Sequence, residues 1–364
     1  MEKVFASPSR YIQGKGILKT GVKHIEKLGK NALLLCGNTT WRVVGEAFHG
    51  ILKDNGFKVT HVPFGGESSM EEVGRVTDIA KADGVDVILG LGGGKVIDTA
   101  KLIADNLNVP VAILPTIASS DAPTSALSVI YTEDGAFEQY VLYKKNPELV
   151  LVDTEIICQA PVRHLVSGMA DAFATWVEGS SAVKAKATSM AGGQPTFAAM
   201  AIAQKCEEVL FEYGLEAVEA NKAGIVNDAL EAVVEANTLL SGIGFESCGL
   251  GAAHSIHNGF TALHGPIHDM THGEKVAYGI LTQLFLEKRP KETFDKYIKF
   301  FQALGLPTTL KDLGLGDATP EDLLKIGQQA TAKGETIHSM PFVITAEEVA
   351  EALKGVNAYV LALG

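Results

Sequence analysis

Six of the ten histidines of this 364-residue chain gather in its last third, where the sequence pattern is helical. Neutral imidazoles together with a carboxylate are good ligands for a borderline divalent ion, and three protein ligands with an open fourth position are typical of a catalytic centre. The clustering therefore indicates a metal centre. The six are His254, His257, His264, His268, His272 and His338.

The carboxylate of such a centre is harder to choose, because the chain has 43 acidic residues. Asp171 stands among small residues in Gly168-Met169-Ala170-Asp171-Ala172, at the start of a helical segment, which favours an inward-facing acid. His254 and His257 are three residues apart and share one helix face, so spacing alone does not choose between them. A lone histidine on a helix is more often an ordinary hydrogen-bonded residue, and that interpretation stays open as well.

A glycine-rich stretch, Gly90-Leu91-Gly92-Gly93-Gly94-Lys95, follows a predicted strand and opens a predicted helix. Glycines allow backbone N–H groups to approach an anion, and a helix N-terminus adds partial positive charge, so the stretch suits a pyrophosphate. It matches neither the G-x-G-x-x-G nor the Walker A pattern. A tight turn that uses glycine only for its backbone freedom is the alternative.

The segment Thr116 to Ser125 begins at the carboxyl end of the next predicted strand. Open α/β sheets bind their ligands at that edge. The segment carries five hydroxyl side chains and the carboxylate of Asp121, which can bond to a ribose, a carboxamide or a polyol. A solvated loop without function is the alternative, although loops at such edges often carry function.

The elements that must position these residues change in kind along the chain. Up to residue 153, short β-rich runs alternate with amphipathic stretches, which predicts a parallel sheet, and Asp134-Gly135 between two apolar runs predicts a hairpin. From about Pro161 the period is helical and convincing strands stop. We therefore expect an α/β fold, with a Rossmann-like domain at residues 1–160 and an all-helical domain at residues 161–364. The predicted strands are 32–36, 58–62, 85–89, 111–114 and 148–153, and those of the hairpin are 125–131 and 140–143.

Composition and charge narrow the class of protein. The net charge is −12 and no basic run occurs, so nucleic acid and anionic membranes are poor partners. No apolar segment reaches the roughly 18 residues that a bilayer span needs. The N-terminal residues lack the pattern of an export signal, and we expect a cytoplasmic location. The four cysteines have no C-x-x-C spacing, which argues against both disulfides and a thiolate zinc site.

Together these motifs resemble those of the iron-containing, or group III, alcohol dehydrogenase superfamily, in the branch that oxidises glycerol. They occur in the family's order and span the chain from Tyr11 to His338. The motifs are Phe64-Gly65-Gly66-Glu67, Gly92 to Lys95 with Asp98 to Lys101, Thr116 to Pro123, Ser125 to Tyr131, Gly242 to Ser247, His254 to Gly259, and His272-Gly273-Glu274-Lys275.

The resemblance implies an NAD-linked, metal-dependent oxidoreductase that converts glycerol to dihydroxyacetone. It places the metal ligands on Asp171, His254 and His272, with Zn²⁺ the usual ion of that branch and Fe²⁺ common elsewhere in the superfamily. Asp121 would contact the polyol, and His257 is a candidate for proton release. A homo-oligomer, an octamer or a dimer, is also implied. The cofactor-binding residues implied are Asn38, Gly94, Lys95, Asp98, Thr116, Ser119, Ser125, Leu127 and Tyr131.

Three positions depart from the family pattern. Asn38 stands where NAD-using relatives commonly carry an aspartate, so NAD is favoured while NADP is not excluded. Cys248 stands where glycine is more frequent, and Thr124 where several relatives have cysteine. Alternative functions are a superfamily dehydrogenase for another diol, an amino alcohol or a glycerol phosphate, a cyclising enzyme on the same scaffold, and a non-catalytic nucleotide-binding protein.

Overall fold

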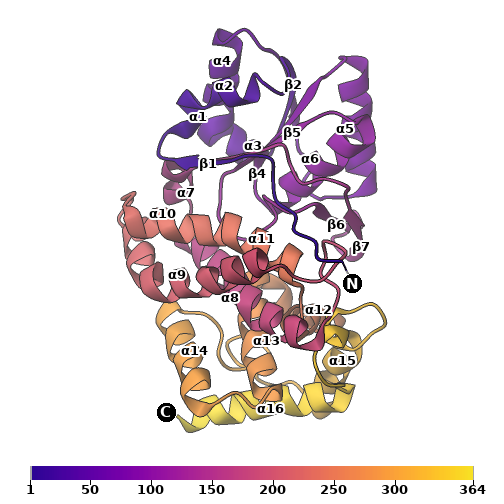
Figure 1. The fold of residues 1–364 in the computed structure, drawn as a ribbon, viewed down its shortest axis with the longest axis vertical. Coiled ribbons are helices and arrows are strands. Elements are labelled where there is room, and N and C mark those ends of the chain that lie inside the picture. The colour runs from indigo at the N-terminus through magenta and orange to yellow at the C-terminus, as the bar shows by residue number, and fades with distance from the viewer. Residues whose placement is uncertain (1, 364) are drawn as a thin grey trace. The chain divides into compact units, whose positions relative to one another are not determined.

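The computed structural model describes residues 2–363, which form two compact units (Figure 1). The sheet unit consists of Ala6–His164 and Glu219–Gly242. The helical unit consists of residues 2–5, Leu165–Val218 and residues 243–363. The predicted boundary at residues 160 and 161 lies close to the end of the first segment of the sheet unit.

Within the described residues, the sheet unit contains one parallel six-stranded sheet with the strand order β1-β8-β5-β4-β2-β3. Residues 32–36 and 149–152 are buried on both faces, which is why these strands read as continuous apolar runs in the sequence. The predicted α/β class is confirmed, and β1 is a strand that the sequence did not indicate. The strands are β1 (Tyr11–Gly14), β2 (Asn31–Cys36), β3 (Lys58–Pro63), β4 (Val87–Gly92), β5 (Val111–Pro115) and β8 (Leu149–Asp153).

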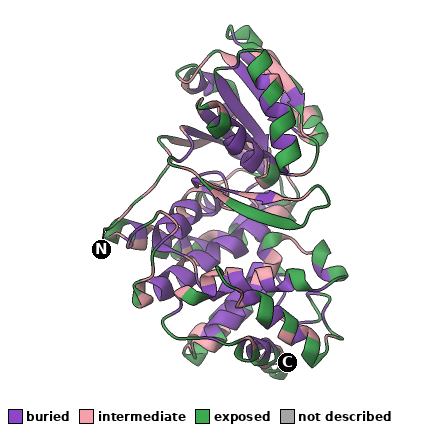
Figure 2. Cartoon of the chain, turned by 90° about the vertical axis from the view of Figure 1, so that its right-hand side faces the viewer, coloured by how far each residue is buried: buried purple, intermediate pink, exposed green. Residues whose placement is uncertain are grey.

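Helices cover the sheet, and Figure 2 shows buried strands beside helices whose outer faces are exposed. The helix α4 buries Phe48 and Leu52 in a core cluster that also contains Leu34 and Leu89 of the sheet. The helix α6 packs against β4 and β5 and so follows the glycine-rich stretch directly. The helices are α1 (Ile17–Thr20), α2 (Val22–Ile25), α3 (Asn38–Thr40), the π-helix η1 (Trp41–Gly45), α4 (Glu46–Asp54), α5 (Met70–Ala82), α6 (Gly94–Leu107), α7 (Thr154–Gln159), α10 (Asp228–Glu235) and the π-helix η2 (Ala236–Leu240).

The predicted hairpin is present as an antiparallel ribbon of β6 (Leu127–Tyr131) and β7 (Phe137–Leu142). Gly135 takes a positive φ of 86° in its turn, as expected of Asp-Gly. The ribbon is attached to α6, because Ser128 Oγ donates to the carbonyl of Asp98 (2.9 Å) and the N–H of Val129 donates to Asp98 Oδ2 (3.1 Å).

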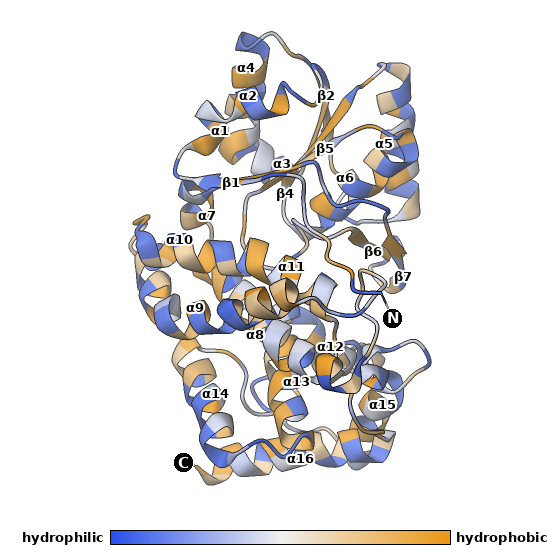
Figure 3. Cartoon of the chain, in the orientation of Figure 1, coloured by the Kyte–Doolittle hydropathy of each residue, from blue (hydrophilic) through white to orange (hydrophobic). Residues whose placement is uncertain are grey.

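The helical unit is built from helices, and its described residues add one isolated bridge, Lys3 with Gln194. The helix α14 shows why the period predicts helix: Phe294, Tyr297, Ile298 and Phe301 are buried at the spacing of one helix face. Figure 3 shows hydrophobic and hydrophilic stretches alternating along this helix. Capping boxes fix two helix starts in this unit, which Thr319 and Thr345 form with residues 322 and 348. The helices are α8 (Val162–Ala185), α9 (Phe197–Lys222), α11 (Ser241–Cys248), α12 (Ala252–Gly259), η3 (Phe260–Ala262), η4 (Pro266–Asp269), α13 (His272–Leu286), α14 (Lys291–Leu304), α15 (Pro320–Ala330), η5 (Thr336–Ser339) and α16 (Ala346–Ala362). Among the described helices, none combines the length and apolarity that crossing a membrane requires.

Candidate active site

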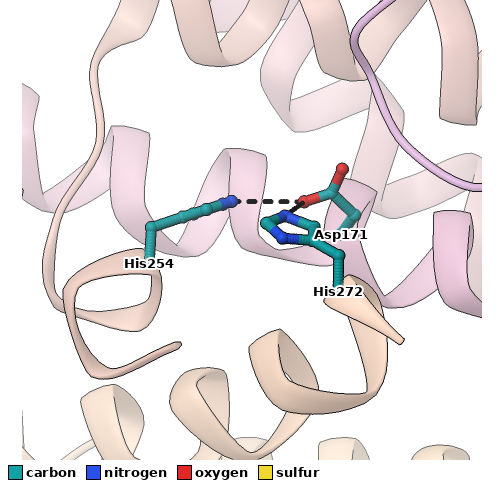
Figure 4. A group of neighbouring side chains, drawn as sticks. All are labelled: Asp171, His254 and His272. Carbon is teal, nitrogen blue, oxygen red and sulfur yellow. Dashed lines mark hydrogen bonds and ion pairs between the residues drawn. The ribbon is translucent and has the colours of Figure 1, made fainter. Parts of the chain in front are cut away.

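Three helices of the helical unit bring Asp171, His254 and His272 together (Figure 4). Asp171 Oδ1 lies 3.2 Å from Nε2 of His254 and 3.1 Å from Nε2 of His272. One ligand atom of each residue lies within 4.8 Å of the other two. Asp171 is 1% exposed, whereas the side chain of His272 is 41% exposed, so the group is closed on the carboxylate side and open on the other.

Small residues let these helices approach closely enough to form the group. A Cβ added to Gly273 at the start of α13 would lie 1.8 Å from the carbonyl oxygen of Ser167 on α8. A Cβ added to Gly279 would lie 2.4 Å from the carbonyl oxygen of Ala253 on α12. The glycines of α13 therefore set the distances between the backbones that carry the three ligands.

A capping box fixes His272 at the first position of α13. Thr271 is the N-cap: its hydroxyl accepts from the N–H of Glu274 (3.3 Å), and Glu274 Oε2 accepts from the N–H of Thr271 (2.7 Å). Such reciprocal bonds hold the first turn of a helix in place. The sequence contains this signal, Thr271-x-x-Glu274, directly at the predicted ligand.

The charges of the group suit a cation. Burial by itself would raise the pKa of Asp171, but the two imidazoles outweigh it and hold that pKa well below its usual range. Burial by itself would lower the pKa of His254, but Glu178 and Asp171 raise it well above its usual range. Protons and metal ions compete for the same lone pairs. A carboxylate and two imidazoles around one point therefore fit a divalent borderline ion.

Glu178 is a site residue that the sequence reasoning missed. Its side chain is fully buried, and Oε2 lies 2.5 Å from Nδ1 of His254. Its Oε1 accepts from the N–H groups of Gly251 and His254, both at 3.0 Å. The available signal was the seven-residue spacing from Asp171, which places both carboxylates on one face of α8 two turns apart.

His257 does not lie against Asp171 but behind His272. Its Nε2 is 3.1 Å from Nδ1 of His272, and its Nδ1 is 3.0 Å from Oδ1 of Asn258. The Asn258 amide in turn donates to both oxygens of Glu335, at 3.0 and 3.3 Å. Burial, and then the charge of His272, lower the pKa of His257 well below its usual value, which keeps this imidazole neutral.

The remaining histidines of the cluster have other contacts. Nε2 of His268 lies 2.6 Å from the carbonyl oxygen of Leu263, and Nε2 of His338 lies 3.2 Å from that of Ala332. The ring of His264 faces that of His268 at 6.4 Å. Of the two histidines that spacing left open, the structure places His254 against Asp171 and His257 against His272.

The predicted cofactor residues all lie in the sheet unit, and several follow the carboxyl ends of neighbouring parallel strands. Gly94 and Lys95 open α6 after β4, and Gly93 caps this helix without a side-chain bond. Thr116 and Ser119 follow β5, where Ser119 is part of the hydroxyl-rich loop. Asn38 is exposed at the start of α3 after β2.

The glycines of the stretch serve close packing instead of unusual backbone angles. Gly90, Gly92, Gly93 and Gly94 are absent from the described positive-φ residues. A Cβ at Gly90 would lie 2.7 Å from Cβ of Ala100, and one at Gly92 would lie 2.9 Å from Val96. The alternative interpretation, a tight turn that uses glycine only for its backbone freedom, therefore does not fit these four glycines. Their absent side chains let α6 begin close to β4.

Two of the predicted cofactor residues are engaged within the chain. Lys95 Nζ forms an ion pair with Glu67 Oε2 at 2.5 Å, and it lies 5.5 Å from the ring centre of Tyr131. Asp98 is 6% exposed, and its carboxylate pairs with the buried Lys101 at 2.9 Å.

The other predicted residues flank the hydroxyl-rich loop. Ser125 is buried, and Leu127 begins β6. Asp121 accepts a hydrogen bond from Ser241 Oγ (3.0 Å), where α11 begins. Thr124 is buried in the same loop, where its hydroxyl donates to the carbonyl of Thr238 in η2 (3.0 Å).

Known proteins share this fold and sequence. Residues 8–154 match the family described as iron-containing alcohol dehydrogenase. The chain is 46% identical to glycerol dehydrogenase from Citrobacter freundii, over 97% of this chain and 96% of that protein. It is 44% identical to glycolaldehyde reductase from Halobacterium salinarum, over the same shares. The crystal structure of glycerol dehydrogenase from Schizosaccharomyces pombe superposes with a TM-score of 0.96 at 43% identity, covering 99% of this chain and 92% of that one.

The chain therefore belongs to the iron-containing alcohol dehydrogenase family. The resemblance predicted from the motifs, to this family and to its glycerol-oxidising branch, is confirmed. The predicted order of an α/β region followed by helices is confirmed by the same structural match.

Proposed function

We propose that the chain is an NAD-linked, metal-dependent dehydrogenase of glycerol and similar vicinal diols. Glycerol and NAD⁺ would give dihydroxyacetone, NADH and a proton. The observation that carries the proposal is the convergence of Asp171, His254 and His272 in a chain that is 46% identical to a glycerol dehydrogenase.

The metal centre is proposed to hold Zn²⁺ on Asp171, His254 and His272, with Fe²⁺ as the alternative ion. A divalent ion in this place and a nicotinamide cofactor supply, respectively, the Lewis acidity that lowers the pKa of an alcohol hydroxyl and the acceptor for its hydride. The side chains hold fixed positions for this purpose, because Asp171 is buried and Thr271 caps α13 directly before His272.

Two further residues are proposed to act on the substrate. Asp121 is a carboxylate in the hydroxyl-rich loop, and we assign it to the hydroxyl groups of the polyol. Its orientation is supported by the hydrogen bond from Ser241. His257 is assigned to proton release because it is a neutral imidazole in contact with a proposed ligand.

The dinucleotide is proposed to bind the carboxyl edge of the sheet, with the domain of residues 1–160 for the cofactor and residues 161–364 for metal and substrate. The uncapped start of α6 would receive the phosphates. The neutral amide of Asn38 bonds a ribose hydroxyl without repelling a 2′-phosphate, so NAD is preferred and NADP tolerated. The residues assigned are Asn38, Gly94, Lys95, Asp98, Thr116, Ser119, Ser125, Leu127 and Tyr131. A cytoplasmic homo-oligomer, an octamer or a dimer, completes the proposal.

A second candidate is the reduction of glycolaldehyde, favoured by the 44% identity to a glycolaldehyde reductase. The carbonyl compounds of the two candidate reactions, dihydroxyacetone and glycolaldehyde, both carry a hydroxyl group next to the reacting carbon. They differ by one hydroxymethyl group on the substrate.

A substrate panel on metal-defined protein tests the proposal. Glycerol, ethylene glycol, 1,2-propanediol and an amino alcohol are oxidised with NAD and NADP in parallel, and dihydroxyacetone and glycolaldehyde are reduced with NADH. We expect glycerol and dihydroxyacetone to have the highest kcat/KM, with activity lost on chelation and restored by Zn²⁺. Activity indifferent to both treatments would remove the metal from the mechanism.

A further inference from the structure

A histidine can bind a metal ion through Nε2 only when its proton sits on Nδ1. The hydrogen-bond partner of Nδ1 therefore decides whether the ring is ready to bind. Both proposed histidine ligands point Nε2 at Asp171, and both have a partner at Nδ1.

For His254 the partner is Glu178. An ionised carboxylate only accepts hydrogen bonds, so Nδ1 of His254 must carry the proton that faces Oε2 at 2.5 Å. Without an ion, Nε2 donates to Oδ1 of Asp171 at 3.2 Å. An ion that binds displaces this proton, and the proton on Nδ1 stays in place. Because Oε1 also accepts the N–H groups of Gly251 and His254, the carboxylate holds the start of α12 and the ring on it together.

For His272 the partner is the end of a chain of three residues. The Asn258 amide donates through its NH₂ to the carboxylate of Glu335, which leaves its Oδ1 facing His257. Nδ1 of His257 must then donate, and its Nε2 must accept. The donor to that Nε2 is Nδ1 of His272. Each step has one allowed direction, so Nδ1 of His272 keeps its proton. Nε2, which faces Oδ1 of Asp171 at 3.1 Å, is then the nitrogen whose proton a bound ion displaces.

We propose that Glu178 and the chain Glu335–Asn258–His257 are positioning residues that fix the tautomer of His254 and His272, respectively, so that both rings offer Nε2 to the ion. The inference rests on the metal centre of the proposed function and adds to it the residues that make the histidines ligands. Outer partners of this kind orient metal ligands in general and strengthen binding.

The burial of Glu178 supports this role. A fully buried carboxylate is costly unless hydrogen bonds and opposite charge compensate it. Among the described residues, the one ion-pair partner recorded for Glu178 is His254, and its other contacts are two N–H groups at the start of a helix. A residue needed only for packing would not require a charge in this place.

The substitution Glu178→Gln tests the first part of the proposal, in which Glu178 fixes the tautomer of His254. With Gln, one oxygen can still accept from the two N–H groups, but the NH₂ then faces Nδ1 of His254 and favours a proton on Nε2. We expect Zn²⁺ affinity, measured by competition with a chromogenic chelator, to fall about 10- to 100-fold. The Tm of the metal-free protein should change little, while its rise on adding Zn²⁺ should shrink.

Glu207→Gln is the matched control, because Glu207 on α9 accepts a hydrogen bond from Tyr297 and touches no proposed ligand. It should bind Zn²⁺ as the wild type does. Wild-type Zn²⁺ affinity in Glu178→Gln would overturn the proposed role of Glu178. If Asp171→Asn binds Zn²⁺ as well as the wild type, the metal centre itself is wrong, and the inference falls with it.

The substitution Asn258→Leu tests the proposed role of the chain Glu335–Asn258–His257 toward His272. It keeps the proposal testable if Glu178→Gln fails to fold. Leucine has a similar size but breaks the link between His257 and Glu335, so either tautomer of His272 becomes accessible. We expect Zn²⁺ affinity to weaken by about 10-fold. Unchanged Zn²⁺ affinity in Asn258→Leu would overturn the proposed role of the chain Glu335–Asn258–His257.

Discussion

At the scale of single residues, Asp171 carries the negative charge of the proposed centre, because one of its oxygens faces both imidazoles. Asp171→Asn keeps the shape and removes the charge. We expect kcat/KM with glycerol to fall by more than about 100-fold and Zn²⁺ to be lost on dialysis. Steady-state kinetics and metal analysis measure both effects. Asp54→Asn, exposed at the end of α4, should behave as the wild type. Full turnover in Asp171→Asn would revive a non-catalytic or metal-free function.

Residue types predicted the triad only with help from the family resemblance. Spacing made His254 and His257 equal candidates, since helix geometry places both on one face. Which of them meets Asp171 depends on how α8, α12 and α13 cross, and no local pattern records a crossing. Glu178 was overlooked for the same reason, because its partner His254 lies 76 positions away.

At the scale of elements, the segment from η2 to the start of α11 holds the loop that carries Asp121. Asn237 donates to the carbonyl of Ala118 (2.9 Å), and Ser241 donates to Asp121 (3.0 Å). A Cβ on Gly242 would lie 2.9 Å from the carbonyl oxygen of Asp121 and 1.8 Å from Thr124 Oγ1. The loop can keep its place only while residue 242 has no side chain.

Gly242→Ala should therefore displace this loop. We expect a loss of about 1 to 3 kcal/mol in the free energy of unfolding, as for other overpacked sites, and a higher KM for glycerol. Gly74→Ala on α5 is the control: its Cβ would meet nothing within 4 Å, and alanine should stabilise the helix by up to about 1 kcal/mol. Denaturant unfolding measures the free energy of unfolding of both variants, and steady-state kinetics measures their KM for glycerol. A Gly242→Ala variant with unchanged KM and stability would show that the loop is not held in this way.

The turn after β3 depends on an ion pair that titrates. Glu72 accepts from the N–H of Gly65 (2.7 Å) and pairs with Arg75, which also donates to the carbonyl of Pro63. Burial acts to raise the pKa of Glu72, but Arg75 and the N–H of Gly65 outweigh it and lower that pKa below its ordinary 4.5.

A depressed carboxylate pKa stabilises the fold above the unfolded pKa, and this contribution is lost as the pH falls through the folded pKa. The stability difference between wild type and Glu72→Gln should therefore be full at pH 7 and shrink below about pH 4.5. Urea unfolding at a series of pH values measures it. A difference that stays constant down to the lowest pH at which both proteins fold would contradict the assignment.

The sequence predicted most elements well and missed two features for physical reasons. The strands β2 and β5 fall close to their predicted ranges, because strands buried on both faces are apolar throughout. The edge strand β3 also matches its predicted range, although it is only partly buried. The strand β1 lies at the edge of the sheet, where Tyr11-Ile12-Gln13-Gly14 is only partly buried and so shows no apolar run. The packing of Glu219–Gly242 with the sheet unit depends on contacts far apart in sequence, such as Tyr11 with Thr238.

At the scale of the whole molecule, the proposed metal ion and the proposed NAD cofactor are assigned to different compact units. All three metal ligands come from the helical unit, and all proposed cofactor residues come from the sheet unit. A ligand that binds only the folded state stabilises it by about 2.7 kcal/mol at a free concentration 100 times its Kd. Hydrogen exchange of backbone amides reports which segments gain that protection.

We therefore expect Zn²⁺ to slow exchange in α8, α12 and the first turn of α13, and NAD to slow it at the start of α6 and in the loop of residues 116–125. In Asp171→Asn the Zn²⁺ effect should disappear while the NAD effect remains, because Asp171 lies in the helical unit and contributes nothing to the sheet edge. Mass spectrometry of peptides after timed exchange measures both. Protection by Zn²⁺ that persists in Asp171→Asn would mean that the ion binds elsewhere, and protection by NAD confined to the helical unit would remove the cofactor from the glycine-rich stretch.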